Sequence, residues 1–546
     1  MTNLSFPEIF EALLKERGIR GDERDIFLNP DYSRLHDPLL LPNMEKARDR
    51  VIAAMKNGEH IVVFSDYDAD GIPGAVVLSD FFRRAGYKNV SFYIPHRHDE
   101  GFGLNMAAID ECEERGAKLI ITVDCGVADY AEVAHANSLG IDVVITDHHE
   151  APEKLPEAHA IVDPKLPGST YPFNGLCGSG VAFKLVQAIL MKESFGIKSG
   201  LEKWSLDMVG IATLSDMVPL VGENRILARF GLEVLRKSPR PGLTALLRNL
   251  NINQKNLSED DIAFMITPRI NAASRMGVPK DAFDLLSTDS AAEAERLAKH
   301  LEKINNERKG IVAAMVKEAK LLLNSRENLP AVIVIGNPEW RPALAGLVAN
   351  SLAEEYMRPA FVWARDGDGK IKGSCRSYNA YDLFELMNKV ANAFTEFGGH
   401  AGAGGFSIAL DGIATLEEKL SLALGSMAGQ ASVTNSEDLT LGISLDDVCE
   451  DLWRTVSQFA PFGTGNEKPV FKISNAPIKS VRQFGKENNH LEISLSNGVK
   501  AISFFSSPES FKLQPSSSTC TLYAHLEKSY FRNRPEIRLR IVDIKI

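Results

Sequence analysis

Three carboxylates follow a short apolar run near the start of the chain. Val62–Phe64 leads into Asp66, Asp68 and Asp70, and a glycine comes next. An apolar run that ends in a turn is typical of a buried parallel strand, and open α/β sheets bind their ligands beyond the carboxyl ends of such strands. Carboxylates this close repel one another unless a cation neutralises them, and hard oxygen ligands suit Mg²⁺ or Mn²⁺. A solvated acidic turn would have the same sequence, so this stretch alone leaves both interpretations open.

The next two apolar runs also end on residues that bind metals. Lys118–Val123 ends at Asp124, and Ile141–Thr146 ends at Asp147-His148-His149. Helix-like segments separate the runs, and parallel strands with helical crossovers place their carboxyl ends at one edge of a sheet. An edge that gathers these carboxylates and imidazoles predicts a two-metal site for phosphoryl transfer.

The bulk properties describe a multidomain globular protein. A chain of 546 residues exceeds what one core usually holds, so we expect two to four domains. No apolar run reaches the roughly 18 residues of a membrane span, and the first residues show no signal-peptide pattern. The six cysteines are scattered without CxxC spacing, which favours a reducing cytoplasm and argues against a disulfide framework or a zinc ribbon.

Charge is distributed unevenly along the chain. The net charge is −11, yet the residues from Asn466 onward carry thirteen Lys or Arg and seven Asp or Glu, a local balance of +6 that leaves −17 for the remainder. Five or six β-type runs with turns between them fill this basic segment and predict a small OB-type barrel. Its aromatic residues could stack on bases or lie in the core: Phe484, Phe504, Phe505, Tyr530 and Phe531.

Between these two regions the pattern is helical and then α/β again. Residues 1–58 predict a helical lead-in, and Ser290–Ser325, which lacks proline, predicts one or two long helices that bridge two halves. A second α/β pattern begins at Ala331–Ile335. We expect Gly398–Gly405 to be a glycine-rich loop before another strand, and Pro268–Gly277 to be a polar, basic turn.

Some residues of these segments could hold a phosphate. Glycines let backbone N–H groups approach an anion, and His400 lies within the glycine-rich loop. Ser374 and Arg376 are close in sequence, which favours recognition of a phosphate end. Arg97 lies in a charged loop after a predicted strand and is a weaker candidate, because a lone loop arginine is usually solvated.

These motifs, taken in order, resemble the RecJ family of the DHH/DHHA1 phosphoesterase superfamily from about residue 25 to the end. The matching segments are Asp66–Gly71, Val123–Gly126, Asp147–His149, Ser215–Pro219, Pro268–Ala272, Asn305–Arg308, Gly373–Ser377, Gly398–His400 and Pro461–Asn466. The chain departs from the family pattern at Trp340–Ala343, which replaces a Trp-His-x-Gly run, and also at Ser274 and Ala403–Gly405. Every carboxylate and histidine of the DHH motifs is present.

The resemblance implies an α/β protein with two α/β domains, a long connecting helix and a C-terminal OB-type barrel. It divides the chain into a helical lead-in (1–58), a DHH catalytic domain (59–289), the connecting helix (290–325), a DHHA1 domain (326–450) and an OB-fold-like nucleic-acid-binding domain (451–546). It implies a monomeric cytoplasmic exonuclease of DNA repair and recombination that degrades single-stranded DNA 5′→3′ with two Mn²⁺ or Mg²⁺ ions. Single-strand-binding protein and a helicase are the partners that it implies.

The resemblance also assigns roles to residues. The metal ligands would be Asp66, Asp68, Asp70, Asp124, His148 and Asp216. We expect Asp124 to be the bridging ligand, because it lies on the middle one of the three motif strands. Asp147 would orient the ligands, and the catalytic residues would be Asp124, His148, His149 and His400. The substrate contacts would be Arg97, Arg269, Ser374, Arg376 and His400.

Two other interpretations stay open. One is a phosphodiesterase of the same superfamily that acts on short oligonucleotides, cyclic dinucleotides or adenosine bisphosphate, although such relatives generally lack a C-terminal β-domain. The other is a non-catalytic DNA-binding scaffold, against which the intact ligand motifs argue.

Overall fold

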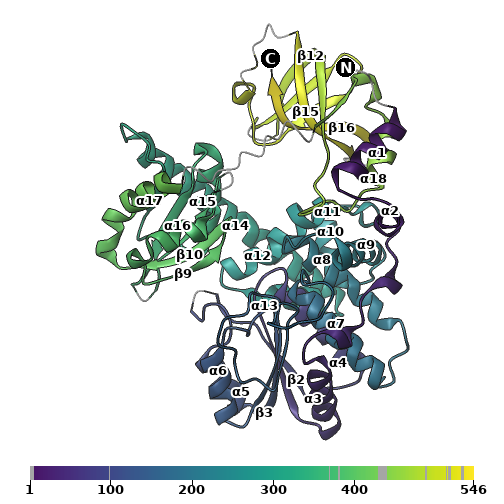
Figure 1. Ribbon diagram of the computed structural model, residues 1–546, viewed down its shortest axis with the longest axis vertical. Helices are drawn as coiled ribbons and strands as arrows, with labels where there is room; N and C mark the ends of the chain where they lie inside the picture. The colour runs from purple at the N-terminus through teal and green to yellow at the C-terminus, as the bar shows by residue number, and fades with distance from the viewer. Residues whose placement is uncertain are drawn as a thin grey trace.

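The computed structural model describes residues 5–545 apart from 98, 368, 379–380, 428–439, 486–487, 512, 514–517 and 531–533. The described residues form two α/β domains and a β-barrel around a central group of helices (Figure 1). The fold class expected from the sequence is therefore confirmed.

The first sheet is parallel throughout, in the order β2-β1-β3-β4-β5. Its apolar side chains are buried on both faces, which explains why its strands are continuous apolar runs in the sequence. Helices α3, α4 and α7 cover one face, and α5 and α6 cover the other. The strands are β1 (His60–Ser65), β2 (Val90–Tyr93), β3 (Ala117–Val123), β4 (Asp142–Thr146) and β5 (Ala160–Val162). The helices are α3 (Met44–Asn57), α4 (Gly71–Arg84), α5 (Met106–Glu114), α6 (Tyr130–Ser138) and α7 (Gly178–Lys192).

A helical region connects the two α/β domains. The prediction of a turn at Pro268–Gly277 is wrong, because Thr267–Arg275 forms helix α12. The proline lies in the first turn of this helix, where no backbone N–H is needed. The expected long helix is confirmed as α14 (Ala291–Asn324), a single helix of 34 residues. The others are α8 (Leu206–Ser215), α9 (Gly222–Leu235), α10 (Pro241–Asn249), α11 (Glu259–Asp261) and α13 (Pro279–Ser287). Within the described residues, no helix is long and apolar enough to span a membrane.

The second sheet is mixed, in the order β6-β7-β8-β10-β9. The expected glycine-rich loop is wrong, because it forms the β9–β10 hairpin; at Gly404, a Cβ would lie 2.7 Å from the Met387 side chain, so the glycine serves close packing. The strands are β6 (Ile333–Gly336), β7 (Ala360–Arg365), β8 (Ile371–Arg376), β9 (Glu396–His400) and β10 (Ala403–Ile408). The helices are α15 (Pro342–Tyr356), α16 (Leu383–Lys389) and α17 (Ile413–Met427).

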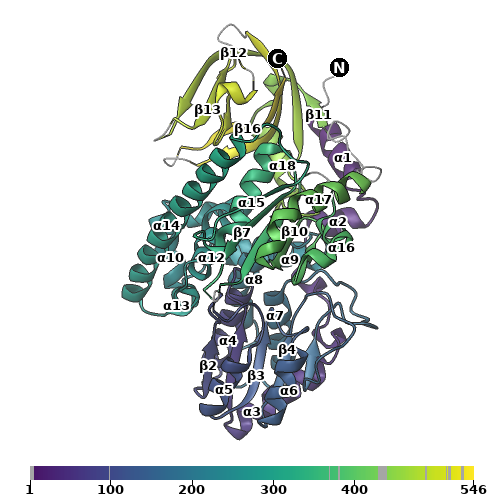
Figure 2. The same cartoon turned by 90° about the vertical axis from the view of Figure 1, so that its left-hand side faces the viewer.

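The C-terminal strands close into a barrel, because β12 pairs with both β13 and β15. The N-terminal lead-in is divided between two bodies: Ile9 and Leu13 of α1 (Phe6–Glu16) are buried in the barrel core, whereas α3 packs on the first sheet (Figure 2). The barrel elements are β11 (Thr440–Ile443), α18 (Glu450–Ser457), β12 (Val470–Phe484), β13 (His490–Leu495), β14 (Lys500–Ser503), β15 (Thr519–Ser529) and β16 (Glu536–Lys545).

Candidate metal centre and phosphate pocket

Consecutive strands of the first sheet end on acidic residues. Asp66, Asp124 and Asp147 follow β1, β3 and β4, and each still donates its backbone N–H to the neighbouring strand at 3.0–3.1 Å. Because the register of the sheet continues through them, their side chains are held at one edge. None of the three is more than 4% exposed.

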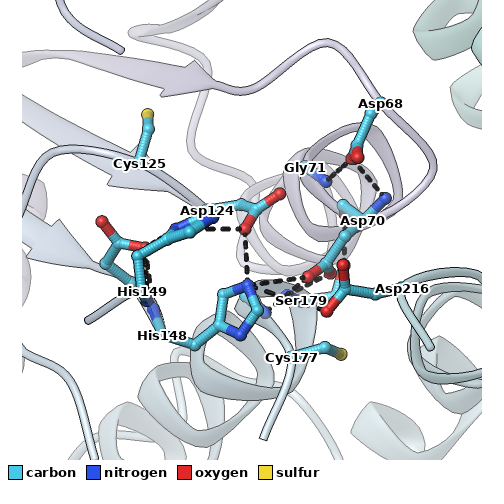
Figure 3. A network of polar contacts seen from close by, with 12 residues as sticks. Asp68, Asp70, Gly71, Asp124, Cys125, His148, His149, Cys177, Ser179 and Asp216 are labelled. Atoms are coloured by element: carbon cyan, nitrogen blue, oxygen red, sulfur yellow. Dashed lines mark hydrogen bonds and ion pairs between the residues drawn. The ribbon is translucent and has the colours of Figure 1, made fainter. Parts of the chain in front are cut away.

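Asp124 occupies the centre of this edge in a left-handed turn. Its φ of 63° is a conformation that residues other than glycine rarely adopt. Gly178 at the start of α7 packs so closely that a Cβ there would lie 2.5 Å from Asp124 Cβ. Across the edge, His148 Nε2 lies 3.0 Å from Asp124 Oδ1 (Figure 3). The strained turn and the absent Cβ thus bring a carboxylate and an imidazole together.

The donor atoms of the edge form three overlapping groups, and within each group all atoms lie within 4.8 Å of one another. The groups are Asp66 with Asp68 and Asp124, Asp124 with His148 and His149, and Asp70 with His148 and Asp216. Asp216 reaches the edge from the end of α8, so a residue far away in sequence joins the strand ends. Asp124 and His148 each belong to two groups.

The burial and the pKa values of these donor groups suit a site for divalent cations. Asp66 Oδ1, Asp124 Oδ1 and His148 Nε2 are buried and make no hydrogen bond of normal geometry, although the last two atoms lie only 3.0 Å apart. Burial, together with neighbouring carboxylates, raises the pKa of Asp66 and Asp124 well above the usual range and that of Asp216 to about 8. Buried oxygens that repel one another need an opposite charge, and oxygen ligands with an imidazole suit Mn²⁺ or Mg²⁺.

Backbone N–H groups hold the remaining two carboxylates of the first turn. Asp70 accepts hydrogen bonds from Gly178 and Ser179 at 2.6 and 2.7 Å, at the N-terminus of α7. Asp68 accepts from the backbone N–H groups of Asp70 and Gly71 at 2.7 and 3.1 Å. Since a helix N-terminus favours negative charge, Asp70 is fixed independently of any cation.

Asp147 holds the two histidines in place. Its carboxylate accepts the backbone N–H of His148 at 2.7 Å and the ring Nδ1–H of His149 at 2.7 Å. Burial lowers the pKa of His149, but the hydrogen bond to Asp147 and its charge outweigh burial and raise that pKa to about 9. Such a contact fixes the orientation and tautomer of an imidazole beside a metal site.

Asp163 is an acidic residue at this edge that the sequence reasoning missed. It follows β5, is fully buried, and its Oδ2 has no hydrogen-bond partner. Burial raises its pKa to about 7, even though Oδ1 accepts the backbone N–H of Lys165. Its signal in the sequence was weak, because an Asp before a proline usually indicates a turn.

Arginines gather where the two α/β domains meet. Burial, and then the charges of Arg97, Arg376 and Arg308, lower the pKa of Arg275 to about 9. Arg275 belongs to α12, yet it donates a hydrogen bond to the carbonyl of Ala343 in α15 at 2.8 Å. Cations that crowd together in this way favour an anion between them.

Two predicted phosphate ligands lie next to each other on β8. Ser374 and Arg376 both face Gly346 of α15, where a Cβ would lie 3.5 and 3.0 Å from their side chains. Arg97 lies over the ring of Tyr67 at 4.9 Å, beside the carboxylate turn. The structure thus brings Arg97, Ser374 and Arg376 into one neighbourhood that joins the two domains.

The two other predicted substrate contacts have different surroundings. Arg269 is 4% exposed and pairs with Glu302 of α14 through Nε and Nη2, at 2.9 and 3.3 Å. His400 lies at the exposed end of β9, and its Nδ1 accepts the backbone N–H of Gly402 at 3.1 Å. Their roles in binding or catalysis stay predictions.

A cavity of about 420 Å³ opens between the domains near the arginine cluster. It is lined by His96, Met276, Gly277, Arg341 and Pro342. Arg341, one of the departures from the family pattern, lies 3.6 Å from the sulfur of Met276, so this substitution adds a cation to the wall of the cavity.

The barrel presents an aromatic and basic surface. His490 contacts the rings of Phe484, Phe504 and Phe505 with centroids 4.9–5.2 Å apart, and Arg540 lies over Phe504 at 4.2 Å. Phe505 is 82% exposed. Of the other expected stacking residues, Tyr530 is 36% exposed, and Phe531 lies outside the described residues. Exposed rings beside arginines are suited to single-stranded nucleic acid.

Comparisons with known proteins agree with these three bodies. Residues 60–213 match the DHH family N-terminal domain, residues 328–426 the DHHA1 domain and residues 440–543 the RecJ OB domain. The chain is 34% identical to the single-stranded-DNA-specific exonuclease RecJ of Bacillus subtilis over 90% of its length, although it spans only 62% of that relative. It is 34% identical to RecJ of Escherichia coli, with 74% of this chain and 72% of the relative covered.

Solved structures extend the likeness to the whole chain. RecJ of Thermus thermophilus in complex with Mn²⁺ superposes with a TM-score of 0.78 at 26% identity, covering 100% of this chain and 79% of the other. A second structure, exonuclease RecJ bound to manganese, gives 0.61 at 31% identity and covers 72% of this chain and 96% of the other. With a carboxylate edge, a DHHA1 domain and a RecJ OB domain in this order, the chain belongs to the RecJ family.

Proposed function

We propose that this protein is a cation-dependent exonuclease that hydrolyses single-stranded DNA in the 5′→3′ direction. The observation that carries the proposal is the overlap of donor groups through Asp124 and His148 at the edge of the first sheet. Two adjacent cations need shared ligands of this kind. The curated relatives are named single-stranded-DNA-specific exonucleases, and the Thermus structures contain Mn²⁺ or Mg²⁺.

The residues at the edge of the first sheet would have different roles in the reaction. Bound cations would lower the pKa of a coordinated water and offset charge on the scissile phosphate. The residues that would hold them are Asp66, Asp68, Asp70, Asp124, His148 and Asp216. Asp124 would be shared, Asp147 would orient both histidines, and His149 and His400 would contact the phosphate from the two domains.

The 5′ end would be held where the two domains meet. Arg97 and Arg376 would bind the terminal phosphate, and Ser374 would donate its hydroxyl to it. Guanidinium–phosphate pairs are strong and directional, so this pocket would fix the register of the strand relative to the carboxylate edge. Arg269 would have to exchange Glu302 for a phosphate to make its predicted contact.

The barrel would hold the strand that leads away from the catalytic domains. Its rings tolerate any base, and its cations would make binding depend on salt. We propose the division into domains at residues 59–289, 326–450 and 451–546 as functional units. A monomeric, cytoplasmic enzyme of DNA repair and recombination that works with single-strand-binding protein and a helicase completes the proposal, which the family membership and the six free cysteines support.

The decisive experiment is digestion of end-labelled DNA. A 5′-phosphorylated single strand, its duplex and a 3′-labelled single strand are incubated with Mn²⁺ or with EDTA. We expect stepwise release of nucleotides from the 5′ end of the single strand only, and only with the cation. Cleavage restricted to di- or trinucleotides would indicate a phosphodiesterase of short substrates, and binding without cleavage would indicate a scaffold.

A further inference from the structure

One candidate metal ligand stands apart from the sheet that holds the others. Asp216 caps α8 and begins a loop of residues 216–221, here called the Asp216 loop. Its Oδ2 lies 3.8 Å from His148 Nε2. The next residue, Met217, has a φ of 59° and is 74% exposed, while the fully buried Asn224 of α9 donates from Nδ2 to the carbonyl of Pro219 at 3.1 Å.

The loop is also held by a segment about 240 residues further along the chain. Leu220, which is 2% exposed, donates its backbone N–H to the carbonyl of Thr464 at 2.7 Å. Thr464 belongs to residues 459–466, here called the barrel linker, which leads from α18 into the barrel. In Figure 1 this yellow-green segment runs from the barrel down to α9 and α11.

The glycines of the barrel linker are packed against the Asp216 loop. A Cβ at Gly463 would lie 2.8 Å from Leu220 Cδ1, and a Cβ at Gly465 would lie 3.4 Å from Pro219 Cβ. Gly465 also has a φ of +72°, which favours glycine. Glycine therefore favours the fit of the two segments, at Gly463 by leaving out a Cβ beside Leu220 and at Gly465 by its positive φ.

Buried polar groups fix the barrel linker itself. Arg225 of α9, 3% exposed, donates to the carbonyls of Phe459 and Ala460 at 2.9 and 3.1 Å. Asn466, 1% exposed, donates to the carbonyls of Phe459 and Pro461 at 2.8 Å each. Breaking such bonds leaves buried groups unsatisfied, so the linker is a rigid support.

We propose that the barrel linker is a positioning element of the metal centre, which holds Asp216 in place through Leu220 and Pro219. The proposal rests on the metal-dependent function proposed above. In this proposal the linker attaches the barrel and also supports the metal centre. The position of Asp216 then depends on how the barrel packs against the helical region. Loss of this support weakens cation binding and leaves the affinity of the barrel for DNA intact.

The test uses the full-length protein with substitutions in the barrel linker. Gly463→Ala places a methyl group against Leu220, and Gly465→Ala places one against Pro219. Gly140→Ala is the matched control, because Gly140 has a φ of +73° with nothing within 4 Å of its Cβ position. Mn²⁺ affinity of the metal-free protein is measured by calorimetry, the melting temperature by circular dichroism, and affinity for a long single strand in EDTA by fluorescence anisotropy.

We expect both linker variants to bind Mn²⁺ about tenfold more weakly, the size of effect that loss of an outer support has at metal sites. DNA affinity in EDTA stays at the wild-type value, and Gly140→Ala changes only the melting temperature. Adding Leu220→Ala to Gly463→Ala makes room for the methyl group and restores Mn²⁺ affinity, a coupling that general destabilisation would not produce.

Folded linker variants with wild-type Mn²⁺ affinity would overturn the proposal, as would an equal loss in Gly140→Ala. If Gly463→Ala does not fold, Gly465→Ala and the double variant decide the question. A wild-type protein that binds Mn²⁺ but leaves single strands intact would refute the nuclease and leave this support measurable. Absence of Mn²⁺ binding by the wild type would refute both.

Discussion

Asp124 shows how a single residue can determine the chemistry of the edge. Its carboxylate belongs to two of the donor groups, and its left-handed backbone is accommodated by Gly178. The sequence indicated its position at a strand end between two other strands with ligands. It could not indicate the turn, because that conformation depends on a helix more than 50 residues further along the chain.

The first prediction concerns the charge of Asp124. Asp124→Asn keeps the shape of the side chain but removes the charge that would balance two cations. Nuclease activity should fall by about three orders of magnitude, since the electrostatic stabilisation at stake is worth several kcal/mol. Single-turnover digestion in saturating Mn²⁺ measures it, with circular dichroism as a check of folding. Near-normal turnover would exclude a bridging role.

The second prediction concerns the buried carboxyl of Asp163. Its folded pKa of about 7 lies above the ordinary 3.8, so the folded state keeps a proton that the unfolded state releases. Its contribution to stability is complete below pH 4 and is lost as the pH rises toward 7. Between pH 5 and pH 8 the loss is about 3 kcal/mol. The new side chain in the variant Asp163→Asn does not titrate, so the variant does not show this loss of stability.

Melting in EDTA measures this difference. The melting temperature of Asp163→Asn relative to the wild type should rise steadily from pH 5 to pH 8. The amide has unmatched hydrogen-bonding groups of its own, but that cost does not depend on pH, so only the trend is diagnostic. A constant difference across the range would mean that Asp163 is ionised in the folded protein.

Among the elements, the strands of the first sheet were the easiest to predict and the hairpin of the second was the hardest. Continuous apolar runs identified β1, β3 and β4 because parallel strands are buried on both faces. The glycines of β9 and β10 predict a loop from the sequence alone. The contact that explains them, the close packing of Gly404 on Met387, is tertiary and leaves no local signal. The packing of α1 on the barrel has the same non-local origin.

The third prediction concerns strand β8, which carries Ser374 and Arg376. The wild type should digest a 5′-phosphorylated strand faster than a 5′-hydroxyl strand, and Arg376→Ala should erase most of that preference, because a guanidinium–phosphate pair is lost. Competition between the two labelled substrates measures the ratio. Arg365→Ala, an exposed arginine at the end of β7, is the control. Equal digestion of both ends by the wild type would place the pocket elsewhere.

On the scale of the whole molecule, the barrel brings a basic surface to an acidic chain. The sequence located this surface through its local balance of +6. It could not show which rings are free, because β-strands alternate between core and solvent and the register was unknown. The structure separates them: Phe471 is fully buried, whereas Phe505 is 82% exposed.

The fourth prediction concerns binding of long strands by this surface. Phe505→Ala should weaken binding of a long single strand by about 1–3 kcal/mol at any salt concentration. Arg540→Ala should instead reduce the dependence of log affinity on log salt by about 0.7, the value for one phosphate contact on a single strand. Anisotropy titrations in EDTA at several salt concentrations measure both. Wild-type affinity and salt slope in both variants would leave the barrel without a part in DNA binding.

Helix α14 places a constraint on how relatives of this protein can differ in length. It is one continuous helix of 34 residues, and the DHHA1 domain follows directly from its end. Each residue of an α-helix advances the chain by about 1.5 Å and turns it by about 100°. A single insertion would therefore swing Ser374 and Arg376 away from the carboxylate edge, whereas seven inserted residues would nearly restore the direction but move the domain about 10 Å. Insertions and deletions should consequently be rare within α14 and common in the loops around it.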